Sequence, residues 1–403
     1  MRRFLLTLMI FTVTLLADEQ VTIATYNLLN YDTASRDAHF RVVMDEINPD
    51  LMVVQEISAA GDVNNFLNNV LNHSGNEYQA GTFLQGPFTN NAIYYKSAKF
   101  TFVDNTRIPT DVRDINQFTV VYNTTSDTLL IYSMHLKAGS DGSDQAQRLL
   151  EINLLRQITD ALPPSTNFIV AGDFNMRSSN EAAYQALLAF NQGAIGAVVD
   201  PINKPGTWHN NSSFSDIHTQ SPRANSFGGG VGGGLDDRFD FLMISLNIQA
   251  SGGIDYVSGS YQAVGNDGNH FNQAINSGQN GVVSQQMANA LHEASDHLPV
   301  TMQLNIETPT GIENAMSEIP QTLVLHQNYP NPFNPTTTIR YELNRADDIQ
   351  LVVYNVLGTE VIRINEGRKP AGAHQIQFNA ADLPSGIYYY QILNQVRKMV
   401  LMK

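Results

Sequence analysis

The chain has no cysteine among its 403 residues. This absence excludes disulfide bonds, thiolate nucleophiles and zinc sites built on thiolates. It does not identify the cellular compartment. With 42% hydrophobic residues the chain can still form sizeable cores, and its length predicts one large domain and a smaller one.

Basic residues are few as well. The chain has 23 Lys and Arg against 38 Asp and Glu, a formal net charge of −15. The imbalance is concentrated in residues 18–325, which hold 13 basic and 32 acidic residues, a net charge of −19. Such a surface repels polyanions at long range. A nucleic-acid substrate would therefore need divalent cations and local contacts to hold it.

A long apolar run occurs only near the N-terminus. Residues 1–3 are Met-Arg-Arg, residues 4–16 are apolar, and Ala17 precedes the acidic residues Asp18 and Glu19. The run is too short to span a bilayer and is typical of a secretory signal peptide cut after Ala17, although Leu15 is larger than such cleavage sites favour. We therefore expect a secreted or cell-surface protein whose mature chain has no transmembrane segment.

Polar side chains stand where predicted strands end. Residues 168–171 are apolar and run into Gly172-Asp173-Phe174-Asn175, as in a strand buried on both faces. Asp173 and Asn175 would project to one side of the extended chain, where they could bind a cation and a phosphate oxygen. Glu56 closes the apolar run 51–54 and needs a partner if buried. A metal ion and a salt bridge at the sheet rim both remain open.

The other candidates occupy similar positions. Asp296 and His297 directly precede an apolar strand, an arrangement that suits a general base. The remaining eight histidines, apart from His135, are expected in loops or on the surface. Further candidates at strand ends and nearby loops are Asn27, Arg113, His135, Lys137 and Asp240. The alternatives are a turn cap for Asn27, a salt-bridged loop residue for Arg113 and an ordinary residue of the sheet rim for His135.

Two helices are predicted between pairs of strands. Apolar residues recur at helical spacing in 37–47, before Asn-Pro, and in 145–162, before Pro-Pro. Strand-helix-strand order seen twice predicts an α/β or mixed sandwich. Residues 200–235 are rich in Gly, Asn, Pro and Ser, which predicts a long flexible loop beside the site.

Six motifs, taken together and in order, closely resemble the endonuclease/exonuclease/phosphatase superfamily with its DNase I-like fold. They are Tyr-Asn-Leu-Leu-Asn at 26–30, Val-Gln-Glu at 54–56, His-Leu-Lys at 135–137, Gly-Asp-Phe-Asn at 172–175, Arg-Phe-Asp at 238–240 and Ser-Asp-His-Leu-Pro at 295–299. The resemblance covers roughly residues 21–305 and implies a four-layer αββα sandwich, with the site at one edge of two packed sheets.

The resemblance also implies roles. Glu56 would bind Mg²⁺, with Ca²⁺ or Mn²⁺ as alternatives, beside Asn27 and Asp296. Such oxygen ligands suit a hard cation. Asp173 and Asn175 would complete the metal and phosphate site.

His297, oriented by Asp240, would activate water for in-line attack on phosphorus. His135 would protonate or stabilise the leaving oxygen, or contact the phosphate. Asn175, Arg113 and Lys137 would contact the substrate phosphate. The carboxylate that supports His135 is left open, with Asp111 and Asp114 as candidates by proximity alone.

The C-terminal part resembles a second family. Residues 306–325 are predicted to be a linker, and Asn-Tyr-Pro-Asn-Pro-Phe-Asn-Pro at 328–335 opens a run of short alternating strands. Residues 326–403 resemble the C-terminal sorting domain of type IX secretion substrates. That implies a small all-β sandwich, handling by the type IX machinery, passage of the outer membrane and removal of the tail. The alternative is a carbohydrate- or protein-binding module.

We therefore expect a signal peptide (1–17), a phosphodiesterase domain (18–305), a linker (306–325) and a sorting domain (326–403). The expected function is a secreted, Mg²⁺-dependent, monomeric nuclease that acts on extracellular DNA or RNA. One alternative is a phospholipid, sphingomyelin or inositol-phosphate phosphodiesterase. Another is a surface-displayed binding protein with a decayed site.

Overall fold

The computed structural model describes residues 18–32, 34–163, 166–189, 196–249, 253–307, 323–343, 346–355, 360–393 and 395–403. The predicted signal peptide and most of the predicted linker lie outside these residues. The chain divides into a larger unit, Glu19–Glu307, and a smaller unit that holds the C-terminal residues. Within the described part of the chain, no helix is long and apolar enough to cross a membrane.

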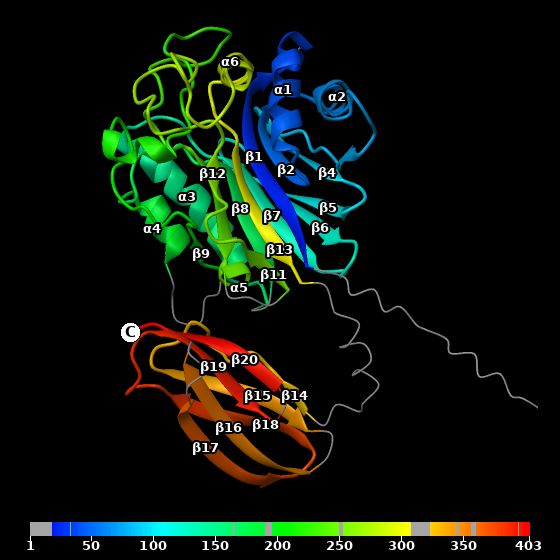
Figure 1. Ribbon diagram of the computed structural model, residues 1–403, viewed down its shortest axis with the longest axis vertical. Coiled ribbons are helices and arrows are strands. Elements are labelled where there is room, and N and C mark those ends of the chain that lie inside the picture. The colour runs from blue at the N-terminus through cyan, green and yellow to red at the C-terminus, as the bar shows by residue number, and fades with distance from the viewer. Residues whose placement is uncertain are drawn as a thin grey trace, which may run out of the picture. The chain divides into compact units, whose positions relative to one another are not determined.

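The larger unit contains two mixed sheets (Figure 1). One sheet has the order β11-β13-β1-β2-β4-β3, with β12 also paired to β13, and the other has the order β5-β6-β7-β8-β10-β9. The strands are β1 (Glu19–Tyr31), β2 (Leu51–Ile57), β3 (Tyr78–Ala80), β4 (Asn90–Lys96), β5 (Phe100–Ile108), β6 (Ile115–Tyr122), β7 (Thr128–His135), β8 (Asn167–Asp173), β9 (Val198–Val199), β10 (Asp240–Ser245), β11 (Ile254–Tyr256), β12 (Gln262–Ala263) and β13 (Val300–Ile306).

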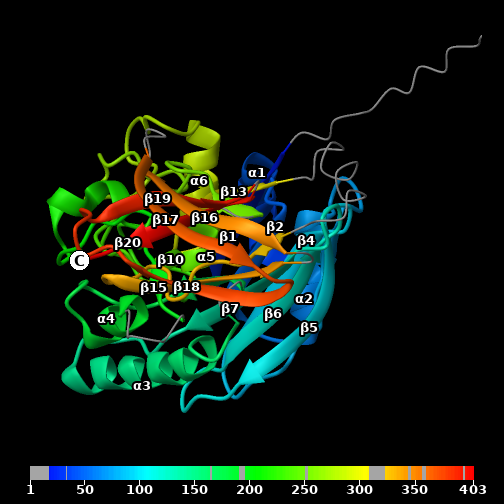
Figure 2. The same ribbon diagram turned by 90° about the horizontal axis from the view of Figure 1, so that it is seen from below.

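Helices cover the outer face of each sheet. The longer ones are α1 (Asp37–Ile47), α2 (Ala60–Phe66), α3 (Gly142–Thr159), α4 (Ala182–Leu188) and α6 (Gln285–Ala294), and α5 (Leu246–Gln249) is a single turn. Helices α1, α2 and α6 cover the β1 sheet, and α3 and α4 cover the β8 sheet (Figures 1 and 2). Buried side chains of these helices join the apolar clusters on the two sheets. A third apolar cluster fills the space between the sheets. The predicted four-layer αββα sandwich is confirmed.

The packing of strand β8 explains why its residues 168–171 are all apolar. All its residues are buried, with Ile169 and Ala171 facing the core between the sheets and Phe168 and Val170 facing the helices. Gly172 is required by close packing. A Cβ at this position, where φ is +131°, would lie 2.0 Å from the carbonyl oxygen of Met134 in β7. The Gly-Asp pair therefore places Asp173 directly after a tight strand contact.

The two predicted strand-helix-strand units are present. Strands β1 and β2 are parallel and connected through α1, and β7 and β8 are parallel and connected through α3. Helix α1 ends at Asn48, which adopts a left-handed conformation before Pro49. Helix α3 begins at Gly142, earlier than the predicted 145, because Asp141 and Asp144 form a capping box.

The C-terminal unit is a two-sheet β-sandwich. Its sheets have the orders β14-β15-β18 and β17-β16-β19-β20 around one apolar cluster. The strands are β14 (Leu323–Leu325), β15 (Thr336–Leu343), β16 (Asp347–Asn355), β17 (Glu360–Lys369), β18 (Gly372–Asn379), β19 (Gly386–Ile392) and β20 (Gln395–Leu401). The small all-β sandwich is confirmed, but β14 lies within the residues predicted to be linker.

Candidate active site

Three polar side chains meet on adjacent strands of the β8 sheet. His135 at the end of β7 pairs in register with Asp173 at the end of β8, and Asp173 pairs with Asp240 at the start of antiparallel β10. Each of the three residues was predicted as a site candidate from the strand segment in which it stands. The sheet pairing places them side by side, with His135 Nε2 3.4 Å from Asp173 Oδ2.

The β1 sheet contributes Asn27 and Glu56. Pairing of β1 with β2 shifts register after Asn27, and Glu56 has a left-handed φ of 60°. Such a conformation is costly for a side chain other than glycine and is found more often at functional sites. The Asn27 amide donates to Glu56 Oε1 and to Asp173 Oδ2, both at 3.1 Å. Asn27 therefore connects the carboxylates of the two sheets.

His297 completes the group. Its Nδ1 lies 2.8 Å from Asp240 Oδ2, and its Nε2 lies 3.7 Å from Asp173 Oδ2. Both histidine and aspartate are buried. The turn that carries His297 is fixed to β1, because the Ser295 hydroxyl donates to the Asn27 carbonyl at 2.7 Å. The predicted orientation of this imidazole by Asp240 thus has direct geometric support.

The two imidazoles differ in their electrostatics. Burial lowers the pKa of His135 well below its ordinary value, and the positive charges of Arg113 and His297 act in the same direction. Burial also opposes protonation of His297, but Asp240 and Asp173 outweigh it and raise its pKa well above the ordinary value. Burial raises the pKa of Asp173, opposed by His297 and reinforced by Asp240 and Glu56. The site thus concentrates carboxylates around two imidazoles whose pKa values are shifted in opposite directions.

The predicted phosphate contacts divide into two groups. The Asn175 amide and the Arg113 guanidinium both donate to the Leu136 carbonyl, at 3.3 and 3.1 Å, so the two side chains are neighbours beside His135. Lys137 has other partners, since its ammonium lies 2.8 Å from Asp144 and 2.6 Å from the Ala138 carbonyl. Asn175 and Arg113 therefore lie together beside His135, whereas Lys137 pairs with Asp144 in the first turn of α3.

The acidic neighbours of His135 differ from the two candidates named by proximity. Asp114 lies 3.4 Å from the Arg107 guanidinium and accepts the Thr110 N–H, while Asp111 is exposed. The carboxylates nearest the imidazole are Asp173 and Glu56, the latter 3.7 Å from Nδ1. Sequence proximity failed because β7 pairs with β8 and faces β2, which are distant in sequence.

Sequence reasoning missed two residues of the site. The Gln220 amide nitrogen lies 2.6 Å from His297 Nε2, and the Thr219 hydroxyl accepts the N–H groups of Phe239 and Asp240. Both stand in the segment predicted to be a flexible loop, in which no local pattern distinguishes them. That segment is irregular but well held, because backbone hydrogen bonds connect residues 219–221 to 234–237.

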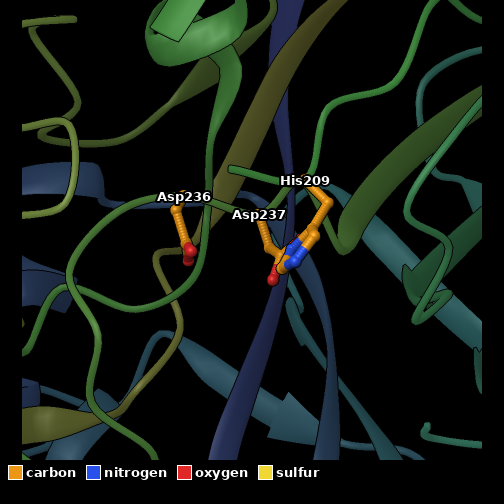
Figure 3. A group of neighbouring side chains, drawn as sticks. All are labelled: His209, Asp236 and Asp237. Atoms are coloured by element: carbon orange, nitrogen blue, oxygen red, sulfur yellow. The ribbon is translucent and has the colours of Figure 1, made fainter. Parts of the chain in front are cut away.

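A second group of ionisable side chains lies one step from the site. His209, Asp236 and Asp237 place one possible ligand atom each within 4.8 Å of one another (Figure 3). Gln220 forms isolated antiparallel β-bridges through its backbone with both Asp237 and His297. His209 Nδ1 lies 2.8 Å from Asp237 Oδ1, so these two side chains satisfy each other as an ion pair, and we assign no cation to the group.

Several solved structures are similar to this chain. One is D. rerio TDP2 complexed with a single strand DNA product (16% identity, TM-score 0.49, covering 72% of this chain and 100% of that one). Others are an endonuclease/exonuclease/phosphatase family protein from Bacteroides thetaiotaomicron (16%, 0.46, 72% and 100%) and the human Nocturnin catalytic domain (14%, 0.46, 72% and 97%). Comparison with curated proteins finds no match.

Two family models match the sequence. The model of the Secretion system C-terminal sorting domain matches residues 327–402, which confirms the prediction for the tail and marks the chain for export across the outer membrane, to the cell surface or beyond. The second model describes the Endonuclease/Exonuclease/phosphatase family and matches residues 24–297, more than half of the chain. The chain therefore belongs to the Endonuclease/Exonuclease/phosphatase family.

Proposed function

We propose that this protein is an exported, divalent-metal-dependent phosphodiesterase that hydrolyses DNA or RNA. Membership of the family supports hydrolysis of phosphoester bonds, and the sorting domain supports action outside the cell. The observation that carries the proposal is the contact of His297 with Asp240 at 2.8 Å, beside Asp173 and the Asn27–Glu56 pair. A buried carboxylate-imidazole pair next to clustered carboxylates suits activation of water against a phosphodiester.

The donor set suits a hard divalent cation. Glu56, Asp173 and Asp296 supply carboxylate oxygens, the ligand type that Mg²⁺ and Ca²⁺ favour. Asp296 Oδ1 is buried and has no hydrogen-bond partner among the described residues. We assign the cation to Glu56 and Asp296. Asn27 accepts the Leu29 N–H at its side-chain oxygen and presents its NH₂ to Glu56, so we assign it to holding that carboxylate in place.

The residues of this chain would then act as follows. Asp240 holds a proton on His297 Nδ1, so that Nε2 accepts a proton from the attacking water. Water forms the new P–O bond as the bond to the leaving oxygen breaks. When bound, the cation would neutralise charge on the phosphate and offset the carboxylates that raise the pKa of His297.

On the opposite side, Asn175 and Arg113 donate hydrogen bonds to the phosphate oxygens. His135 has a lowered pKa and is therefore neutral, which suits an N–H donor that stabilises the leaving oxygen. Its Nδ1 is buried, has no hydrogen-bond partner in the described chain and lies 3.7 Å from Glu56 Oε1.

The test is hydrolysis by the purified full-length chain with Mg²⁺, Ca²⁺ or Mn²⁺, and with EDTA. Duplex DNA, RNA, sphingomyelin and bis-p-nitrophenyl phosphate are assayed in parallel. We expect metal-dependent cleavage of nucleic acid. Activity confined to the lipid would keep the chemistry and favour the alternative substrate class, which the net charge of −19 over residues 18–325 makes the strongest competitor.

A further inference from the structure

A glycine-rich segment places one apolar side chain beside the site. In the sequence Gly-Gly-Gly-Val-Gly-Gly-Gly at 228–234, Val231 is the only residue with a side chain beyond hydrogen. Its backbone is fixed at both ends: the N–H donates to Asp296 Oδ2 at 2.8 Å, and the carbonyl accepts the Ser221 hydroxyl at 2.9 Å. The residue is nevertheless 48% exposed. The segment thus holds the backbone of Val231 against an active-site carboxylate and leaves the residue accessible to solvent.

The glycines around Val231 are required by close packing. A Cβ on Gly230 would lie 2.6 Å from the Arg223 guanidinium, 2.7 Å from Leu29 and 3.0 Å from Asp296. A Cβ on Gly234 would lie 2.1 Å from the backbone of Asn272. The contact at Gly234 is with backbone atoms and would force the backbone to move, whereas a Cβ on Gly230 would displace neighbouring side chains.

Phe227 begins the same turn. Its carbonyl accepts the N–H of Gly230 at 3.0 Å, and its ring lies 4.1 Å from the guanidinium carbon of buried Arg223 and 5.2 Å from the His292 ring. The ring is still 37% exposed. Arg223 is fixed in turn by the His292 and Glu293 carbonyls, at 2.8 and 3.0 Å. Phe227 is therefore a supported aromatic side chain with a free edge.

We propose that Phe227 and Val231 form the subsite for the nucleoside next to the scissile phosphate, with the base packed against these two side chains. The inference rests on the proposed function and adds the group by which a nucleic acid is distinguished from a small phosphate ester. Base contacts of this kind tolerate any sequence, because every base has an apolar face. They also supply affinity that does not depend on positive charge, which this acidic chain has little of.

The size of the surface favours a nucleoside over a bilayer. Phe227 and Val231 are two exposed apolar residues of one segment, which is a small apolar area. A membrane-binding surface needs a larger apolar area, aided at anionic bilayers by basic residues. The test must therefore also be able to detect hydrolysis of a lipid substrate.

The experiment compares two single-stranded oligonucleotides with the full-length chain in Mg²⁺. One carries normal bases, and the other carries tetrahydrofuran abasic residues on both sides of the scissile phosphate. We expect the wild-type KM to be about tenfold lower for the oligonucleotide with bases. Val231→Ser and Phe227→Ala should each raise that KM toward the abasic value and leave kcat and the abasic substrate unchanged. Phe227→Leu should restore part of the difference.

Val282→Ser is the matched control, because Val282 is also an exposed valine, at 61%, and lies outside the site. Oligonucleotide cleavage that is equally fast in wild type and in both variants would overturn the subsite and leave the nuclease function standing. An equal loss on both substrates would also overturn it, since the side chains would then act on the phosphate site. If the wild type cleaves neither oligonucleotide but hydrolyses sphingomyelin, the proposed function itself fails.

Discussion

Asp240→Asn is expected to lower kcat/KM about 10³-fold. Asp240 Oδ2 lies 2.8 Å from His297 Nδ1, and neither side chain is open to solvent that could replace the contact. An amide nitrogen in place of Oδ2 would require His297 Nδ1 to accept a hydrogen bond, which moves the ring proton to Nε2. That atom could then no longer accept a proton from water. General-base catalysis contributes about 10²–10⁴ in rate, equivalent to about 3–5 kcal/mol.

The assay is a comparison of Asp240→Asn, His297→Ala and the double variant on an oligonucleotide at saturating Mg²⁺. Since the two residues act as one unit, the double variant should lose no more activity than His297→Ala alone. Losses that multiply would refute the coupling, and near-complete retention of activity by His297→Ala would refute its role as the base. His73→Ala is the matched control, because His73 is an exposed histidine paired with Asp45. Thermal unfolding verifies that each variant is folded.

Three further predictions test the metal, the core and the domain boundary. Glu56→Gln should sharply raise the Mg²⁺ concentration needed for half-maximal activity, and an unchanged requirement would place the ion elsewhere. Asp200→Asn should destabilise the fold by about 3–5 kcal/mol in denaturant titrations at pH 7, because it leaves buried Arg238 without the carboxylate that binds it at 2.7 and 2.8 Å. Burial opposes ionisation of Asp200, but the charge of Arg238 outweighs burial and lowers the pKa of Asp200. The ion pair therefore stabilises the fold above the ordinary Asp pKa, and this stabilisation is lost as pH falls through the lowered pKa. Equal acid sensitivity of wild type and variant would contradict this prediction. A fragment of residues 18–307 should be soluble and active. A fragment of residues 18–305 lacks Ile306, a buried residue of β13, and its free energy of unfolding should be lower by about 2 kcal/mol. Identical denaturation midpoints of the two fragments would refute this.

The single strands of the site were predictable from local pattern. The apolar residues before Asp173 alternate between two cores, and a strand covered on both faces needs apolar residues at every position. Helix α1 and the strand before Glu56 were predictable for similar reasons, since period and end signals are properties of a short window. The position of a carboxylate at a strand end therefore follows from the sequence, whereas its partner does not.

The contacts between the sheets depended on resemblance rather than on pattern. Asn27 touches Asp173 across 146 positions of sequence, and this contact exists only because two sheets pack face to face. Gln220 reaches His297 from an irregular segment whose conformation is set by contacts with 234–237. Two histidines expected in loops or on the surface, His218 and His270, are buried, because loop residues on this scaffold are themselves covered.

In the C-terminal unit the sequence pattern predicts strands only over 338–343, 349–354, 374–378 and 386–392, so three strands were missed. β14, β17 and β20 all lie at edges of their sheets. β17 and β20 are interrupted by charged residues, as in Glu-Val-Ile-Arg-Ile-Asn-Glu-Gly-Arg-Lys at 360–369. Charges on edge strands discourage pairing with other molecules. The same charges obscure the alternation by which a strand is recognised, so edge strands are harder to predict than central ones.

The acidic surface of the chain and the carboxylates of its site act on a substrate in the same direction. Glu56, Asp173, Asp240 and Asp296 surround the place where we assign a phosphate, and His297 and, more weakly, Arg113 oppose their negative charge at Asp173. A phosphodiester would be repelled by this group of carboxylates in the absence of a cation. A surface with a net charge of −19 adds to that repulsion rather than relieving it. We therefore expect substrate binding as well as turnover to depend on the divalent ion, and the uncharged contacts proposed for Phe227 and Val231 would add affinity for a nucleic acid that the few basic residues do not supply.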